Sequence, residues 1–180
     1  GVELPTDMIL RAIFPSENTF KNLVVAIHFY STTKFTYTNK NNTIMQNTHV
    51  VIMAGGIGSR FWPLSTPEFP KQFIDILGCG RTLIQLTTDR FKGVCPDENF
   101  WVVTNASYVD IVKEQLPQIP HSHILAEPAA RNTAPCIAWA CWNIRNENVN
   151  ANVVVTPADA VVMNPEEFRR VIGNALEFTK

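Results

Sequence analysis

The chain of 180 residues has no long apolar run and no excess of either charge. Its apolar runs, such as Val50 to Ala54, fall far short of the ~20 residues that cross a bilayer. With 15 Lys and Arg against 16 Asp and Glu, the formal net charge is −1, so no global field attracts nucleic acid or an anionic membrane. We therefore expect no membrane and no nucleic acid as partners, and any bound anion must be held by a local arrangement of donors.

Cysteine is scarce and irregularly spaced. A domain of this size buries roughly 70 % of its unfolded surface and needs neither disulfides nor a structural metal to fold. The cysteines follow neither the paired CxxC spacing of zinc sites nor the regular spacing of a secreted disulfide framework. We therefore expect reduced thiols in a cytoplasmic protein, without a zinc site. The four cysteines are Cys79, Cys95, Cys136 and Cys141.

Tryptophan is absent from residues 1–44, and Gly1 is the one glycine there out of eight in the chain. Residues 31–43 are rich in Thr and Asn and carry no apolar repeat of helical period. The two parts of the chain therefore look unrelated. We predict that residues 1–44 are an extension outside the fold, disordered or weakly structured. Met45 is then the natural start, and residues 45–180 form the N-terminal nucleotide-binding part of a larger domain.

From Met45 onward, apolar runs typical of buried parallel strands alternate with segments of helical periodicity. The runs cover residues 49–54, 100–104, 123–126 and 152–156, and the helices are predicted to begin at Thr82, Asn105, Asn132 and Pro165. The first three are capping residue types, and proline is favoured in a first helical turn. This alternation requires right-handed crossovers and a parallel sheet covered on both faces. The prediction is a three-layer α/β/α, Rossmann-like fold with a mainly parallel sheet, truncated at the C-terminus.

Three glycines follow the first of these strands, at the sheet edge where α/β proteins bind ligands. Gly55, Gly56 and Gly58 match neither the dinucleotide pattern GxGxxG nor the Walker A pattern. Because they lack Cβ atoms, main-chain N–H groups can approach a polyphosphate closely. Arg60 and Lys71 add cationic donors that match phosphate oxygens. The pattern indicates a triphosphate site, and the alternative is a tight turn with two surface cations.

Polar loops follow two other strands at the same edge. Residues 127–135 lead into a helix, whose N-terminus favours anions or a polar base edge. The alternative is an ordinary cap at Asn132, with Arg131 paired to Glu127. Asp159 follows the last strand, where one or two carboxylates would hold Mg²⁺ against a phosphate; the alternative is a turn or capping residue. Agreement among the three strand ends favours nucleotide chemistry.

These segments resemble the mannose-1-phosphate guanylyltransferases, a group within the sugar-phosphate nucleotidyltransferases. The similar segments are residues 51–65, 70–73 and 127–135, and the resemblance covers about residues 47–180. The glycine, arginine and lysine pattern indicates the wider family, and the Arg-Asn-Thr-Ala-Pro segment narrows it. The resemblance implies that a phosphate oxygen of mannose 1-phosphate attacks the α-phosphorus of GTP. The products are GDP-mannose and pyrophosphate, with no covalent enzyme intermediate.

The resemblance also implies a role for individual residues. Arg60 and Lys71 would stabilise charge on the triphosphate, and Asp159 would act with them by holding the cofactor Mg²⁺. The partners implied are GTP and mannose 1-phosphate, and a homo-oligomer of the full-length form stays open. The residues implied to bind the nucleotide are Gly55, Gly56, Gly58, Ser59, Glu127, Arg131, Asn132 and Thr133.

The sequence departs from the family pattern in two ways. Ala160 stands where the family commonly has His after the metal-site aspartate, which weakens the site without removing the ligand. Family catalytic domains also continue past the helix at 165–180, adding the sugar pocket and a second metal acid. We therefore expect an N-terminal fragment that is inactive by itself.

Three alternatives stay open. The first is a nucleotidyltransferase that uses a different sugar 1-phosphate or nucleotide. The second is a non-catalytic nucleotide-binding or regulatory module of the same fold. A dinucleotide-dependent oxidoreductase is the third. It is disfavoured because the third glycine is missing and Thr104-Asn105 stands where an acid would end the second strand.

Overall fold

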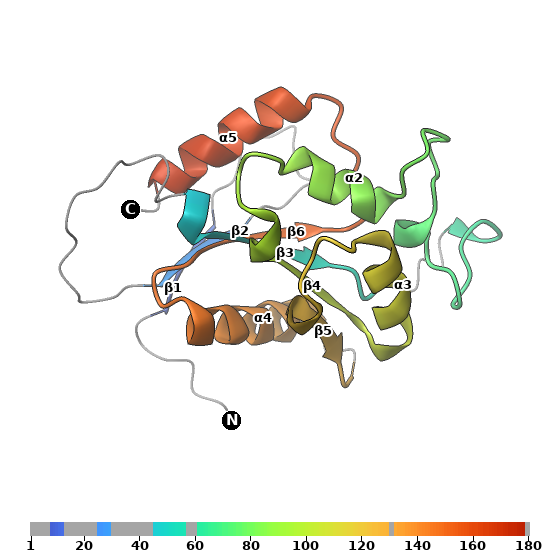
Figure 1. The fold of residues 1–180 in the computed structure, drawn as a ribbon, viewed down its shortest axis with the longest axis horizontal. Helices are drawn as coiled ribbons and strands as arrows, with labels where there is room; N and C mark the ends of the chain where they lie inside the picture. The colour runs from blue at the N-terminus through green and yellow to red at the C-terminus, as the bar shows by residue number, and fades with distance from the viewer. Residues whose placement is uncertain (1–7, 13–24, 30–44, 57–60, 130–131, 179–180) are drawn as a thin grey trace.

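A computed structural model describes residues 8–12, 25–29, 45–56, 61–129 and 132–178. Within these ranges the chain forms one sheet with helices on both of its faces, as the ribbon shows (Figure 1). The predicted three-layer α/β/α arrangement is confirmed. The helices are α2 (Leu83–Arg90), α3 (Val109–Gln115), α4 (Thr133–Glu147) and α5 (Pro165–Phe178).

The sheet has six strands in the order β1-β2-β6-β3-β4-β5. The four strands that the sequence predicts, β6, β3, β4 and β5, are mutually parallel. β2 runs antiparallel to β6, and β1 runs antiparallel to β2. The strand bounds are β1 (Met8–Ala12), β2 (Val25–Phe29), β3 (Thr48–Met53), β4 (Phe100–Asn105), β5 (Ile124–Glu127) and β6 (Asn152–Pro157).

The strands β1 and β2 depart from the expectation that residues 1–44 lie outside the fold. The backbone of β2 pairs with β6, with Val25 opposite Val155 and His28 opposite Asn152. The sequence prediction relied on strands that alternate with helices, which is the pattern of a parallel sheet. An antiparallel strand needs no helical crossover, so this pattern does not indicate β2. The apolar segment around β2 supplies β-branched residues for pairing, and β6 offers an open edge. The rest of residues 1–44 lies outside the described part of the chain.

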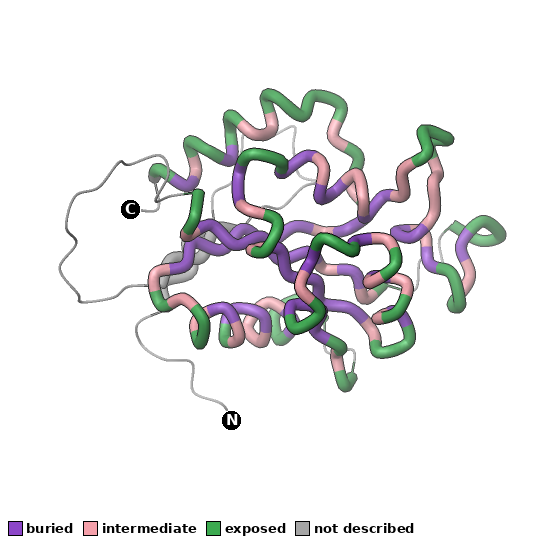
Figure 2. Tube along the Cα trace, in the orientation of Figure 1, coloured by how far each residue is buried: buried purple, intermediate pink, exposed green. Residues whose placement is uncertain are grey.

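Each face of the sheet carries its own apolar core, because successive side chains of a strand point to opposite faces. On one face Val50 and Ile52 pack among residues of α2, α3 and α5. On the other face Val51 and Trp101 pack against α4. Figure 2 shows the buried residues concentrated in the strands and along the inward sides of the helices. Each large side chain buried in this way contributes about 1.5–3 kcal/mol to folding.

The starts of α2, α4 and α5 agree with the sequence prediction, and α3 begins later than predicted, at Val109. Thr82 forms a capping box with Gln85 at the start of α2. The Asn105 side chain accepts the Ser107 N–H at 2.9 Å and caps the 3₁₀ helix η4 (Ala106–Tyr108), which leads into α3. Asn132 occupies the N-cap position of α4, but its side chain makes no capping hydrogen bond. At α5, the side chain of Asn164 accepts the Glu167 N–H at 3.1 Å. The cap of α5 is therefore the residue before Pro165.

The carboxyl ends of β3 and β6 lie side by side in the sheet. From β3 the chain moves outward through β4 to β5, and β6 then returns on the other side of β3. This reversal is the topological switch point at which α/β sheets bind ligands. The Ala158 N–H donates to the Met53 carbonyl at 3.1 Å, so the loops after β6 and β3 start in contact. Within the described part of the chain, the helices are too short or too polar to cross a membrane.

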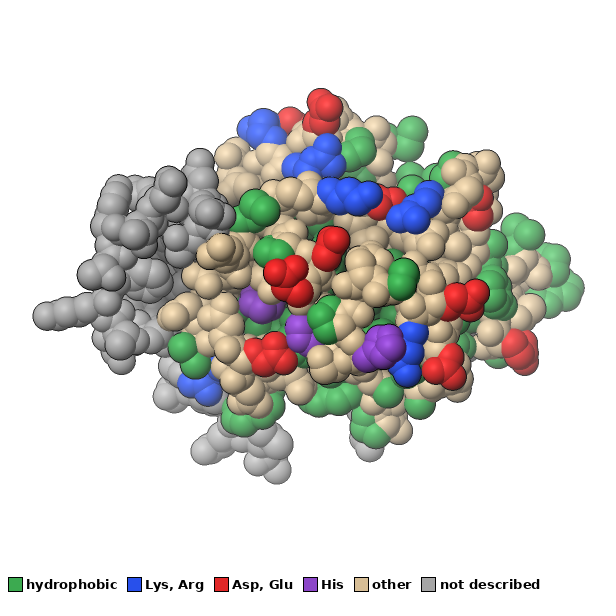
Figure 3. Space-filling view, in the orientation of Figure 1, with side chains coloured by type: hydrophobic (Ala, Val, Ile, Leu, Met, Phe, Trp, Pro, Cys, Tyr) green, Lys and Arg blue, Asp and Glu red, His purple; other side chains and the backbone are tan. Residues whose placement is uncertain are grey.

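At the opposite end of β3 lies His49, which is buried together with two aromatic rings. The Trp101 indole N–H donates to His49 Nδ1 at 3.2 Å, and the indole stacks on the His123 ring with centroids 3.8 Å apart. Figure 3 shows histidine side chains grouped with carboxylates on this side of the molecule. Burial, and secondarily the charge of His123, lowers the pKa of His49 to about 4.

This environment predicts that acid destabilises the fold. Between a pH of about 6.5 and about 4, His49 is protonated in the unfolded chain but neutral in the folded one, so stability falls as the pH falls. From pH 7.5 to pH 5 the loss from His49 amounts to about 2 kcal/mol. Urea unfolding at both pH values measures it. The His49→Gln variant should show a smaller loss, and an unchanged pH dependence would contradict this assignment.

Candidate active site

The loop after β3 begins the candidate site. The Ala54 N–H donates to the Val103 carbonyl at 2.8 Å, so the backbone pairing of β3 with β4 continues one residue beyond the end of β3. A Cβ added to Gly55 would lie 3.0 Å from Glu127 Oε2, whereas one on Gly56 would meet nothing within 4 Å. Gly55 therefore permits close approach to the end of β5, and Gly56 faces open space. Gly58, Ser59 and Arg60 lie outside the described residues.

Gln72 holds this glycine-rich loop from a second segment. It lies in the short 3₁₀ helix η2 (Lys71–Phe73), and its side-chain amide donates to the Ala54 carbonyl at 3.0 Å and the Gly56 carbonyl at 2.8 Å. Gln72 is buried. The sequence does not indicate this role, because a glutamine beside a lysine carries no signal of a contact with a loop that precedes it by 16 to 18 residues.

Removing this amide should loosen the loop. We expect Gln72→Leu to lower the free energy of unfolding by about 1–3 kcal/mol, because two hydrogen bonds of about 0.5–1.5 kcal/mol each are lost. If the loop binds a nucleotide, the affinity for GTP should also fall, by about 10-fold or more. Calorimetry and urea unfolding measure the two effects. The control is Gln85→Leu, which removes two hydrogen bonds at the start of α2 and should leave GTP affinity unchanged. Equal GTP affinities in the Gln72 variant and the wild type would contradict the assignment.

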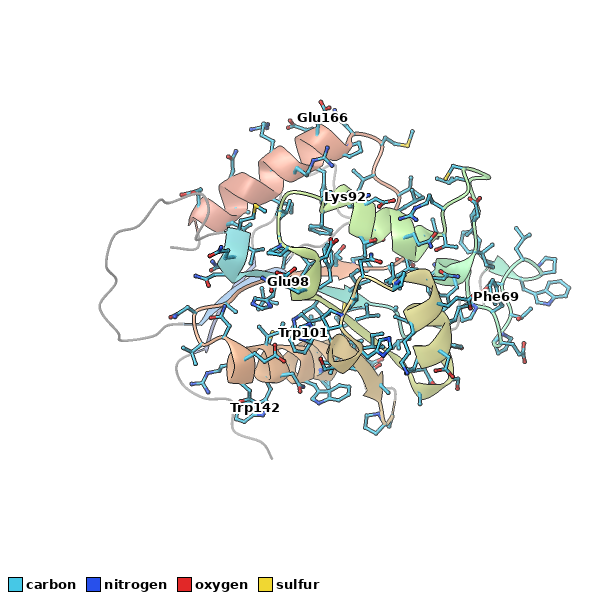
Figure 4. The ribbon with its side chains drawn as sticks, viewed as in Figure 1. Phe69, Lys92, Glu98, Trp101, Trp142 and Glu166 are labelled. Carbon is cyan, nitrogen blue, oxygen red and sulfur yellow. The ribbon has the colours of Figure 1, made fainter. Side chains whose placement is uncertain are left out.

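Lys71 and Asp159, both predicted as site residues, meet in the structure. Lys71 Nζ lies 2.7 Å from Asp159 Oδ2, with 23 % and 40 % of the two side chains exposed. An ion pair this accessible to water adds about 0–1 kcal/mol to stability, so it is weak enough to exchange for ligand contacts. Lys71 Nζ also lies 5.1 Å from the centre of the Phe61 ring. Phe61 begins a loop that projects from the body of the molecule at Phe69 (Figure 4).

The loop that carries Asp159 is held from both sides. Ala158 is tied to β3, as described above, and Arg90 of α2 donates to the carbonyls of Pro157 and Ala160. Asp159 is therefore an exposed carboxylate on a fixed backbone. The sequence does not indicate this role of Arg90. An arginine near the end of a helix is commonly exposed, because its charge interacts favourably with the helix dipole there.

The loop after β5 contributes a second carboxylate. Glu127 ends β5, and burial raises the pKa of its carboxyl group above the usual range. Thr133 begins α4, a helix of 15 residues, and both Asn132 and Thr133 are exposed. Asn132 has φ 67° and ψ −171°, a positive-φ conformation outside the left-handed helical region that glycine adopts far more readily than asparagine. The ordinary capping alternative for Asn132 is therefore not what the structure contains. Arg131 lies outside the described residues, and so does its expected pairing with Glu127.

Asp159 is an exposed carboxylate at this edge, a kind of group that binds magnesium ions. In the part of the chain that the structure describes, no group of three or more His, Cys, Asp or Glu side chains could hold a metal. Mg²⁺ is commonly bound through one or two carboxylates plus substrate phosphates. The exposed Asp159 carboxylate meets that requirement. The four cysteines are unpaired, and Cys95, Cys136 and Cys141 are buried.

Comparisons with known proteins show which family the chain belongs to. Residues 49–178 match the family model described as nucleotidyl transferase. The mannose-1-phosphate guanylyltransferase of Escherichia coli K12 is 39 % identical over 135 residues, which are 72 % of this chain and 28 % of that protein. The alginate biosynthesis protein AlgA of Pseudomonas putida is 40 % identical over 129 residues, 69 % of this chain and 26 % of AlgA. The chain thus spans less than a third of the length of these curated relatives.

A solved structure supports the fold. It is described as a mannose-1-phosphate geranyltransferase from Thermus thermophilus and matches with a TM-score of 0.66 at 28 % identity. The match covers 74 % of this chain and 38 % of that one. The resemblance to mannose-1-phosphate guanylyltransferases that the motifs predict is confirmed by relatives of that name. Since the family model covers residues 49–178 and the fold agrees, the chain belongs to the nucleotidyl transferase family.

Proposed function

We propose that the full-length protein is a mannose-1-phosphate guanylyltransferase, which converts GTP and mannose 1-phosphate to GDP-mannose and pyrophosphate. One observation carries the proposal. Lys71 Nζ and Asp159 Oδ2 are 2.7 Å apart, at the sheet edge where Gly55 and Gly56 follow β3. A cation and a carboxylate are thus placed together where a nucleotide triphosphate would bind. Relatives named mannose-1-phosphate guanylyltransferase support the choice of substrates.

The reaction requires the protein mainly to position the two substrates and to stabilise the charge of the transition state. A phosphate oxygen of mannose 1-phosphate forms a bond to the α-phosphorus of GTP. The bond from that phosphorus to the bridging oxygen of the β-phosphate breaks, and pyrophosphate leaves with the electron pair. Lys71 and Arg60 would stabilise the negative charge that gathers on the phosphates. Main-chain N–H groups of Gly55, Gly56, Gly58 and Ser59 would bind phosphate oxygens.

Asp159 is the residue that would hold Mg²⁺. When bound, the ion neutralises phosphate charge and orients the triphosphate. Lys71 Nζ can turn from Asp159 toward a phosphate oxygen, and the weak, partly exposed ion pair permits that exchange. Once Mg²⁺ is bound at Asp159, Lys71 would be available to contact the triphosphate.

The nucleotide pocket would lie between the glycine-rich loop and the start of α4. Glu127 lies against Gly55, and its carboxylate suits N–H or hydroxyl donors of a base or ribose. Asn132 and Thr133, with Arg131, would complete the pocket at the N-terminus of α4, where unpaired N–H groups favour polar ligands. A cytoplasmic location is part of this proposal, supported by the unpaired cysteines.

A substrate panel tests the proposal. The full-length protein is incubated with Mg²⁺, each of the four ribonucleoside triphosphates and several sugar 1-phosphates, and pyrophosphate release is measured. We expect the highest kcat/KM with GTP and mannose 1-phosphate. A clear preference for another pair would assign the protein to a different sugar-1-phosphate nucleotidyltransferase. GTP binding without pyrophosphate release from any pair would indicate a non-catalytic nucleotide-binding module.

A further inference from the structure

One side chain of α2 holds the backbone on both sides of Asp159. Arg90 Nη1 donates to the Ala160 carbonyl at 2.6 Å. Its Nη2 donates to Thr156 Oγ1 at 2.6 Å and to the Pro157 carbonyl at 3.2 Å. These acceptors precede and follow Asp159, and they lie 66 to 70 residues from Arg90 in the sequence. The end of β6 and the loop after it are therefore tied to a distant helix through one guanidinium group.

The guanidinium group is itself held in place. Arg90 is 5 % exposed, and its Cζ lies 5.6 Å from the centre of the Phe91 ring and 5.4 Å from that of Phe168. The two rings pack edge to face at 5.0 Å, which joins α2 to α5 around the arginine. Cations over aromatic faces are attracted to the ring quadrupole. The fork of donors thus has little freedom to turn away from the Asp159 loop.

The chemistry of the site calls for arginine at this position. Burial lowers the pKa of Arg90 to about 10 and the Asp159 carboxylate opposes the fall, so the group stays charged at neutral pH. A planar fork can reach three acceptors at once, whereas lysine is a single point of charge on a flexible stem. The acceptors on Pro157 and Ala160 are main-chain carbonyls. The contact therefore does not depend on the side chain at position 160, where alanine stands.

We propose that Arg90 is a positioning residue of the nucleotidyl transfer site, which fixes the loop from Thr156 to Ala160 so that Asp159 stays beside Lys71. The inference rests on the proposed function, because it assigns Arg90 a role through the residue that would hold Mg²⁺. Arg90 touches neither phosphate nor sugar in this account. Arg90 would affect the reaction indirectly, by holding the Asp159 carboxylate in position. Residues that hydrogen-bond to metal ligands generally act in this way.

The test uses Arg90→Lys in the full-length protein, which keeps the charge and loses the fork. Calorimetry measures the Mg²⁺ concentration that gives half-maximal binding of GTP, and thermal unfolding is followed in parallel. We expect the required Mg²⁺ concentration to rise about 10-fold or more, with a matching fall in kcat. The control is Arg81→Lys, because Arg81 also uses its fork, on Asp89 of α2. It should leave the Mg²⁺ requirement unchanged.

A second variant keeps the test decisive if Arg90→Lys fails to fold. Thr156→Val removes one acceptor of Arg90 and preserves the size of the side chain. It should raise the Mg²⁺ requirement by about 2- to 10-fold. A folded Arg90→Lys protein that is less stable but needs no more Mg²⁺ would make Arg90 merely structural and overturn the proposal. So would an unchanged Mg²⁺ requirement in Thr156→Val when Arg90→Lys does not fold. Wild-type protein that binds GTP equally with and without Mg²⁺ would contradict the proposed function itself, and with it this role.

Discussion

Replacing Lys71 by methionine in the full-length protein is expected to lower kcat for GDP-mannose formation by about 10²- to 10³-fold. Methionine preserves most of the length of the side chain and removes its charge. Lys71 lies against Asp159 at the site, so the lost charge is one that would stabilise the phosphates in the transition state. Steady-state assay of pyrophosphate release measures the effect, and calorimetry should find weaker binding of GTP.

The matched control for this variant is Lys92→Met. Lys92 also forms an ion pair with an aspartate, at 2.9 Å from Asp89, but 72 % of its side chain is exposed. Lys92 follows α2 in the sequence, and Figure 4 shows it well apart from the Phe69 loop that precedes Lys71. The control should keep wild-type turnover. Near-wild-type turnover in Lys71→Met would remove Lys71 from the catalytic residues.

Replacing Asp159 by asparagine should have an effect of comparable size, with a different signature. The variant keeps the shape of the side chain and removes the charged oxygen that would hold Mg²⁺, so we expect kcat to fall at least about 10²-fold. Because Lys71 then loses its partner, binding of GTP in the absence of metal should become tighter. Calorimetry with a chelator present measures that binding.

Asp89→Asn provides the comparison for Asp159→Asn. Asp89 of α2 pairs with Arg81 and Lys92, outside the site, so its loss should change neither turnover nor metal-free binding of GTP. If Asp159→Asn binds metal-free GTP more weakly than the wild type, Lys71 is not released by the change. The exchange of partners proposed for Lys71 would then be wrong.

The parallel part of the fold could be predicted because its signals are local. The apolar runs at β3, β4, β5 and β6 are continuous, and each is followed by a helix of clear periodicity. Parallel strands place their carboxyl ends at one edge, so the sequence also predicted that Lys71 and Asp159 belong to one site. The structure joins these two residues, which lie far apart in the sequence, with one ion pair.

The features that the sequence did not predict depend on contacts between distant segments. Gln72 holds the loop after β3, and Arg90 holds the loop after β6, yet each looks like an ordinary polar residue in its own segment. Likewise β2 pairs with β6, which lies far along the chain, and the apolar segment around β2 does not show which strand it joins. Asn132 has the residue type of a cap, but its backbone takes φ 67° and its side chain makes no capping bond.

The most direct test of the central claim is a product analysis of the full-length protein. The protein is incubated with GTP, mannose 1-phosphate and Mg²⁺, and the nucleotide sugar and pyrophosphate are quantified by chromatography. The account predicts GDP-mannose and pyrophosphate in a one-to-one ratio, both strongly reduced by Lys71→Met and formed in wild-type amounts by the Lys92→Met control. Binding of GTP with neither product formed would contradict it.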